Sequence, residues 1–218
     1  MEPFRFHTPC SILVVGSSGC GKTVFVDHLL QQMKNNFDRP IHKVVYCHGV
    51  WQDHFNNMQA RGGIKFHEGL PSDDLGNIFP PSQRPGLLIL DDLMSDAGQD
   101  RTVLDLFTKE LITRILLKST FDKTCFHLEN MPKTISRKAH YIVAFKIPRD
   151  QLGVRNLVQL SFPHDVRGMM QVYRDATSRE YGYLLFDLHP RTADNVCLKS
   201  CLLHQEGPTV VYWRKEEL

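Results

Sequence analysis

The sequence has no long hydrophobic run, and this excludes a protein that crosses a membrane with a helix. A membrane-spanning helix needs about 20 consecutive apolar residues, whereas the longest apolar runs, around Leu87 and Val143, are much shorter. No signal peptide opens the chain. We therefore expect a protein without membrane contact that stays inside the cell, in the nucleus or the cytoplasm.

A large excess of charge of either sign is also missing. The formal net charge of the 218 residues is +2. A nucleic-acid-binding surface would therefore have to be local, or be assembled from several subunits. Hydrophobic residues make up 42% of the chain, which is enough for a folded core. Internal repeats and low-complexity segments are absent, so we predict a single domain over residues 1–218.

The six cysteines show neither a CxxC pair nor a Cys/His zinc spacing. We expect free thiols in a reducing compartment. Cys197 and Cys201 could face the same side of a helix, although burial of two thiols explains them better than a metal site does.

Short apolar runs alternate with amphipathic stretches along the chain. The runs predict strands at residues 11–15, 43–46, 64–66, 86–90, 141–145 and 183–186, and helical spacing predicts helices at 23–33, 101–112, 150–160 and 165–173. Strands that alternate with helices favour a mostly parallel sheet covered on both faces. The sequence therefore predicts a three-layer α/β domain with a central sheet.

The segment between the first predicted strand and the first predicted helix matches the phosphate-binding motif G-x-x-x-x-G-K-[ST] at every defined position. Its glycines allow the backbone N–H groups to wrap a phosphate chain. Lys22 is expected to reach the β- and γ-phosphates of ATP, and Thr23 to hold Mg2+. A glycine-rich turn that binds nothing is the alternative, which the strand and helix on either side disfavour. The residues predicted to bind the nucleotide are Gly16, Ser17, Ser18, Gly19, Cys20, Gly21, Lys22 and Thr23.

Two adjacent acids, Asp91 and Asp92, follow the most apolar predicted strand. We predict that Asp91 holds Mg2+ and that Asp92, with Lys22, is catalytic by orienting or deprotonating the attacking water. A pair of solvated turn carboxylates is the alternative. Between the two motifs there is room for one strand unit, and a later strand could insert between the motif-bearing strands. These features predict a RecA-like P-loop NTPase that hydrolyses ATP.

Five further segments resemble the genome-packaging ATPases of the FtsK-HerA superfamily, in the form carried by Maverick/Polinton elements, adintoviruses and large DNA viruses. They are YCHGVWQ (46–52), FHEGLP (66–71), LLILDDLM (87–94), TISRKAHYIVAFKIPRD (134–150) and ATSREYGYLLFDLHP (176–190). The resemblance implies a homo-oligomeric ring that couples ATP hydrolysis to movement of double-stranded DNA into a capsid. Capsid proteins are then further expected partners, and association with the virion is a further expected location. Arg149 and Asp150 lie in a family-typical signature whose role the sequence does not explain.

Residues 111–131 depart from this family, in which a His-His turn and a strand ending in glutamine follow the acidic motif. Back-translation of residues 111–133, read from the third base of each codon, gives His-His-Pro-Asn-Ile-Thr and later Gln-Asn-Leu-Phe-Pro-Pro-Gly-Lys. We hypothesise two compensating frameshifts in the gene. The segment ITRILL (112–117) is still apolar enough to form a strand. A decayed or co-opted copy that binds ATP with little hydrolysis is therefore the alternative function.

Weaker signals remain open. A P-loop kinase for a small acceptor is disfavoured, because no arginine-rich lid follows the acidic motif. Candidates for an arginine finger acting on a neighbouring subunit are Arg101, Arg114 and Arg137, although a solvated surface suits each of them better. Trp51, Gln52 and Phe55 could touch DNA or adenine, with core packing favoured. A small basic cluster, Lys133, Arg137 and Lys138, could face DNA, with a solvated face as the default.

Overall fold

A computed structural model describes residues 4–71, 75–91, 93, 113–119 and 138–213. These residues form one nine-stranded sheet with the order β3-β2-β4-β5-β1-β6-β7-β8-β9. The strands are β1 (Ser11–Gly16), β2 (Lys43–His48), β3 (Ile64–Glu68), β4 (Gly86–Asp91), β5 (Thr113–Ser119), β6 (Tyr141–Phe145), β7 (Tyr183–Asp187), β8 (Leu198–Ser200) and β9 (Val210–Tyr212). All pairs from β3 to β6 are parallel, and the pairs from β6 to β9 are antiparallel. The predicted mostly parallel sheet is confirmed.

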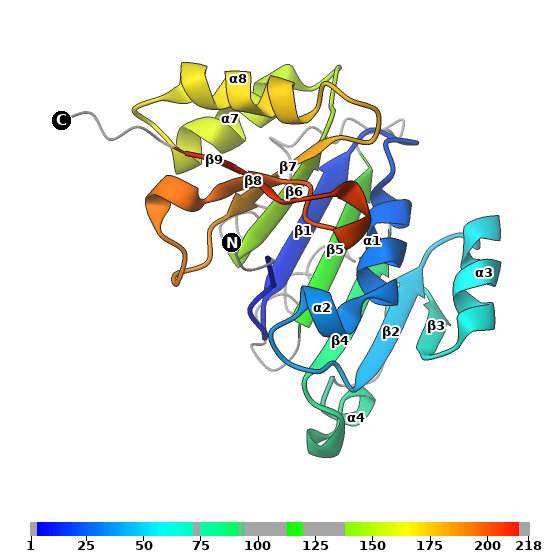
Figure 1. Cartoon of the computed structure of the whole chain (residues 1–218). Coiled ribbons are helices and arrows are strands. Elements are labelled where there is room, and N and C mark those ends of the chain that lie inside the picture. The colour runs from blue at the N-terminus through cyan, green and yellow to red at the C-terminus, as the bar shows by residue number, and fades with distance from the viewer. Residues whose placement is uncertain (1–3, 72–74, 92, 94–112, 120–137, 214–218) are drawn as a thin grey trace.

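Helices cover both faces of this sheet (Figure 1). The helices are α1 (Lys22–Gln31), α2 (Met33–Asn36), α3 (Asp53–Arg61), α4 (Leu75–Ile78), α7 (Gln151–Ser161) and α8 (Val166–Ala176), with short 3-10 turns η1 (Pro81–Gln83), η3 (Asp194–Val196) and η4 (His204–Glu206). Neighbouring residues of a strand point to opposite faces. Along β1, Leu13 and Val15 pack with residues of α7 and α8, whereas Ile12 and Val14 pack with residues of α1 and α3. The three-layer architecture is therefore also confirmed.

The central strands are buried on both faces, as their uninterrupted apolar sequences require. Every residue of β1, β4, β6 and β7 is buried. Strand β5 lies between β1 and β4, with Ile115 opposite Ile12 on one side and Ile89 on the other. This is the later strand that the sequence allowed for between the two motif-bearing strands. Part of the segment that departs from the packaging ATPases therefore still forms a central strand.

Several elements differ from the sequence-based predictions. The predicted helix 23–33 ends at Gln31, and a separate short helix begins at Met33. Helix α3 and strands β8 and β9 were not predicted. Cys197 and Cys201 do not share a helix, because the residues between them pair with β7 as strand β8. Both thiols are buried, as expected. The predicted helix at 101–112 lies outside the described residues.

Two other expectations concern metals and membranes. In the part of the chain that the structure describes, no group of three or more His, Cys, Asp and Glu residues could hold a metal ion. None of the helices within the described ranges has the length and apolar character needed to cross a bilayer.

Tyr173 on α8 fastens the end of β6 to the helical layer. Its buried hydroxyl donates to the carbonyl of Phe145 at 2.7 Å and accepts from the N–H of Ile147 at 3.0 Å. Burial raises the pKa of Tyr173 to about 12, so the hydroxyl keeps its proton and the donated bond at neutral pH. One side chain thus satisfies two backbone groups where the chain leaves the sheet, next to the end of β1.

We predict that Tyr173→Phe destabilises the protein by about 1–3 kcal/mol, because two buried backbone groups lose their partner. Urea unfolding at pH 7 measures the change. Ser178→Ala is the control, since it removes an exposed hydroxyl that also donates to a backbone carbonyl, at 2.7 Å, and is expected to cost less than about 0.5 kcal/mol. Equal effects of the two substitutions would contradict the prediction.

Candidate functional site

The loop from β1 to α1 has the backbone conformation that its glycines permit. Gly19 and Gly21 have φ values of 73° and 100°, in a region that residues with a β-carbon rarely adopt. Gly21 is the N-cap of α1, and its carbonyl accepts from the N–H of Phe25 at 2.8 Å. At Gly16 a β-carbon would lie 2.4 Å from Cys20 Sγ and 2.7 Å from Phe145 Cβ. The glycine positions of the motif are therefore set by backbone geometry and close packing.

Lys22 is folded back onto this loop. Its Nζ donates to the carbonyls of Gly16 at 3.0 Å and Ser17 at 2.9 Å, and the residue is only 6% exposed. Nζ also donates to Cys20 Sγ at 3.9 Å. The ammonium group is therefore held at the loop by neutral acceptors, which compensate a buried charge less well than an anion does. Nearby, burial raises the pKa of the Cys20 thiol, so that this side chain stays neutral.

Asp91 is the last residue of β4 and is 6% exposed. It lies opposite Leu117 of β5, and Leu117 lies opposite Val14 of β1. The register thus brings the acid to the same edge of the sheet as the loop. The hydroxyl of Tyr46 donates to Asp91 Oδ2 at 2.6 Å. Burial, and then the Asp91 carboxylate, raise the pKa of Tyr46 far above its ordinary value, so Tyr46 remains a donor.

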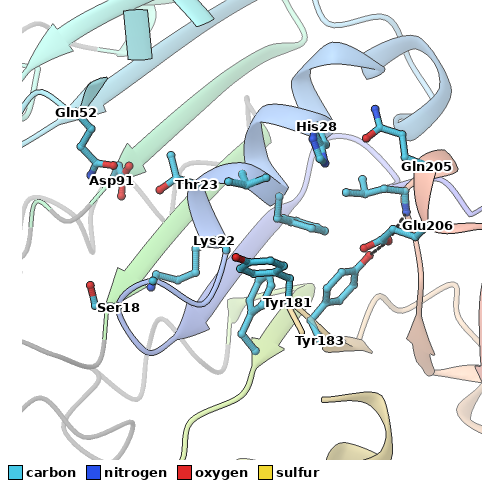
Figure 2. Close-up of a pocket in the computed structure, with 16 residues that line it drawn as sticks. Ser18, Lys22, Thr23, His28, Gln52, Asp91, Tyr181, Tyr183, Gln205 and Glu206 are labelled. Atoms are coloured by element: carbon cyan, nitrogen blue, oxygen red, sulfur yellow. Dashed lines mark hydrogen bonds between the residues drawn. The ribbon is translucent and has the colours of Figure 1, made fainter. Parts of the chain in front are cut away.

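One cavity of about 740 Å³ contains both groups. Thr23, Lys22 and Asp91 line it together with Gln52, which lies just before α3 (Figure 2). The cavity continues along α1 toward the C-terminal segment of the chain. Its remaining lining residues are Ser18, Gly19, Gly21, Val24, Phe25, His28, Phe145, Tyr181, Tyr183, Leu203, Gln205 and Glu206.

The donor set fits a magnesium-bound triphosphate. Mg2+ prefers oxygen ligands and is usually held by one or two carboxylates together with substrate phosphates and waters. Thr23 and Asp91 provide a hydroxyl and a carboxylate in the same cavity as the Lys22 ammonium. A β-carbon at Gly19 would meet nothing within 4 Å, so the loop is open on that side. An anion, a metal ion and the backbone N–H donors of the loop can therefore meet at this point.

The other predicted residues fall into three groups. Phe55 is fully buried, in agreement with core packing. Trp51 is exposed, so the expectation of core packing is wrong for it, although its ring packs edge-on against Phe55 and Phe66. Asp150 is the N-cap of α7, where it accepts from the N–H of Gly153 at 2.9 Å. Outside the described residues lie Asp92, Arg101, Lys133, Arg137 and the side chain of Arg114.

Sequence reasoning missed the part of the cavity that comes from later segments. Tyr181, Tyr183 and Leu203 line it but belong to no motif. Arg149, of the family-typical signature, lines a second cavity of about 460 Å³ on the other side of Tyr181, together with Ser17 and Cys20 of the loop. The one sequence feature that pointed to this part was the resemblance of segment 176–190, which contains Tyr181 and Tyr183, to the packaging ATPases.

Comparisons with known proteins give two findings. A model of the family described as "Poxvirus A32 protein" matches residues 5–187. The solved structure of the genome packaging NTPase B204 from Sulfolobus turreted icosahedral virus 2, in complex with ATP-gammaS, is similar with 12% sequence identity and a TM-score of 0.48, covering 96% of this chain and 98% of that one. Among proteins with curated descriptions, none matches this chain.

We predict that Tyr46→Phe destabilises the protein by about 1.5–3 kcal/mol, the range for a hydrogen bond to a charged group. The ring packing against Phe55 and Phe66 remains, so the loss isolates the bond to Asp91. Urea unfolding at pH 7 measures it. Tyr212→Phe is a matched control, because its exposed hydroxyl also bonds a carboxylate, Asp175, at 3.0 Å; exposed pairs contribute little. Unchanged stability in Tyr46→Phe would contradict the prediction.

Proposed function

The chain belongs to the family of poxvirus A32 proteins, and we propose that it is an ATPase that drives the packaging of double-stranded DNA. Membership confirms the sequence-based prediction of a relationship to the genome-packaging ATPases of large DNA viruses. One observation carries the catalytic part of the proposal. The loop of residues 16–23, which contains Lys22, and the end of β4, which contains Asp91, line a single cavity. They follow strands that lie on either side of β5.

Phosphate binding would use the loop backbone and Lys22. The loop N–H groups and the N-terminus of α1 attract an anion. Lys22 now bonds the carbonyls of Gly16 and Ser17. On nucleotide binding its ammonium would exchange these neutral acceptors for phosphate oxygens, which accept stronger, charge-assisted bonds. The nearly buried position of Lys22 places this charge at the loop before the ligand arrives.

Metal binding and water activation would use the neighbouring oxygen groups. We assign Thr23 and Asp91 as the protein ligands of Mg2+, which neutralises charge on the phosphates when it is bound. Tyr46 would keep the Asp91 carboxylate oriented through its 2.6 Å bond. Asp92, the next residue along the chain, is proposed to orient or deprotonate the attacking water. Both acids then act at the end of one strand.

Family membership supports the proposed coupling of ATP hydrolysis to DNA packaging. We propose double-stranded DNA as the partner and a homo-oligomeric ring as the working form, with capsid proteins as further partners. With a net charge of +2, a DNA-binding surface would be local or would be assembled from several subunits, and a ring provides the second arrangement.

ATP binding with little hydrolysis is the second candidate, and one observation favours it. The register places Ser119, the last residue of β5, opposite Gly16 at the start of the loop. Packaging ATPases of this type have a glutamine at the end of the corresponding strand, which the shifted reading frame would restore. Loss of one such polar group typically lowers the rate by ~100- to 1000-fold.

Phosphate release with and without double-stranded DNA tests the proposal. We expect DNA to stimulate turnover, chelation of Mg2+ to abolish it, and Lys22→Ala to lower it by at least ~100-fold, since the variant loses the charge aimed at the phosphates. Lys34→Ala is the control, because Lys34 is exposed on α2 and does not line the cavity.

Each other outcome has a defined meaning. Nucleotide binding without phosphate release supports the second candidate. DNA-independent turnover by an assembled ring argues against DNA packaging. Absence of ATP binding in millimolar Mg2+ overturns the function altogether.

A further inference from the structure

Tyr181 occupies a turn position that suits glycine. The turn runs from Arg179 to Gly182, and the N–H of Gly182 donates to the carbonyl of Arg179 at 3.1 Å. Tyr181 is the third residue of this turn and has a φ of 57°. Turns with a positive φ at the third position normally carry glycine or asparagine there. A strained conformation of a bulky residue is a reason to look for a function of its side chain.

The ring of Tyr181 lies against the phosphate-type loop. A β-carbon built on Gly21 would be 3.0 Å from Tyr181 Cδ1, so the ring packs beside the last glycine before Lys22. Nevertheless Tyr181 is 61% exposed. Its side chain lines both the main cavity and the second cavity that contains Arg149, and therefore stands between them. Figure 2 shows the ring next to Lys22 and Tyr183.

The face of this ring is what the side chain offers to a ligand. The neighbouring Glu180 carboxylate raises the pKa of Tyr181, so the phenol stays neutral at pH 7. The other Phe and Tyr residues that line the main cavity are Phe25, Phe145 and Tyr183, and all three are buried, whereas the imidazole-bearing His28 is half-buried. Among the described Phe and Tyr residues that line this cavity, Tyr181 alone is exposed.

Tyr183 holds in place the part of the cavity that Leu203 and Gln205 line. Its hydroxyl bonds the carboxylate of Glu206 and accepts from the N–H of Leu202 at 2.8 Å. Glu206 also accepts from the N–H of Leu203 at 3.0 Å. These bonds fix the turn around η4, so that Leu203 and the Gln205 amide line the cavity. An aromatic face, an apolar side chain and an amide suit a flat heteroaromatic group.

We propose that Tyr181 stacks on the base of the bound nucleoside triphosphate and that Leu203 and Gln205 complete a base-binding site. This inference rests on the proposed function, because it needs the triphosphate at the loop beside Gly21. The ring lies next to the phosphate end and faces the cavity that extends along α1, so one ligand can reach both. Base recognition is then added to phosphate binding by residues outside the motif.

Binding of ATP and of inorganic tripolyphosphate, each with Mg2+ and measured by calorimetry, tests this proposal. The wild-type protein should bind ATP about tenfold more tightly than tripolyphosphate, as expected for a base stacked on an aromatic ring. Tyr181→Gly should raise the Kd for ATP about tenfold and leave that for tripolyphosphate unchanged. Its melting temperature should not fall, because glycine suits this turn position. Tyr181→Phe keeps the ring and should retain the preference for ATP.

Trp213→Ala is the matched control, since Trp213 is a 64% exposed aromatic residue that lines neither cavity. It should leave both affinities unchanged. Wild-type affinity for ATP in Tyr181→Gly would overturn the inference, and so would an equal loss of affinity for both ligands, which would mean that the ring only supports the loop. The proposed function survives either result. If the wild-type protein binds neither ligand, the proposed function itself fails.

Discussion

The parallel register of three strands is the constraint on which the whole site depends. Val14 of β1 and Asp91 of β4 both lie level with Leu117 of β5. Because the strands are parallel, their carboxyl ends meet at one edge of the sheet. The loop and the acid are far apart in sequence, yet they come together because each is located at the carboxyl end of its strand. A shift of one residue in either pairing would turn the strand's side chains to the opposite face.

Local sequence was sufficient to predict this part of the molecule. Residues 16–23 specify a turn through their glycines, and Asp91 ends a strand that is apolar enough to be buried. The structure brings these groups into one cavity. The inserted strand was harder to predict, because 113–119 lies within the segment that is unlike the related ATPases. It forms nevertheless, since a central strand needs mainly apolar residues, and Ile115, Leu116 and Leu117 supply them.

Other elements escaped prediction because their stability is not local. Strand β8 has three residues, Leu198–Ser200, and depends on hydrogen bonds to β7 and β9 on either side. Helix α3 has few apolar residues, and it is held to α1 by a buried carboxylate. Asp27 of α1 pairs with Arg61 and lies 3.2 Å from His54, both on α3. This contact connects the helix of the loop to the helix that follows Gln52, and no pattern in either segment predicts it.

The two parts of the cavity therefore differ in how the sequence encodes them. The part that is proposed to bind phosphate is contiguous, because backbone conformation and one lysine in residues 16–23 create most of it. The remainder is assembled from 181–183 and 203–206, and it is held by bonds from Tyr183 to Glu206 and Leu202. A triphosphate has the same charge whatever base it carries, so a local motif can recognise it. A base is distinguished by a flat face and a few polar edges, and these require side chains that meet only after folding. The class of chemistry can consequently be predicted from the sequence, whereas the fit to a base depends on the tertiary structure.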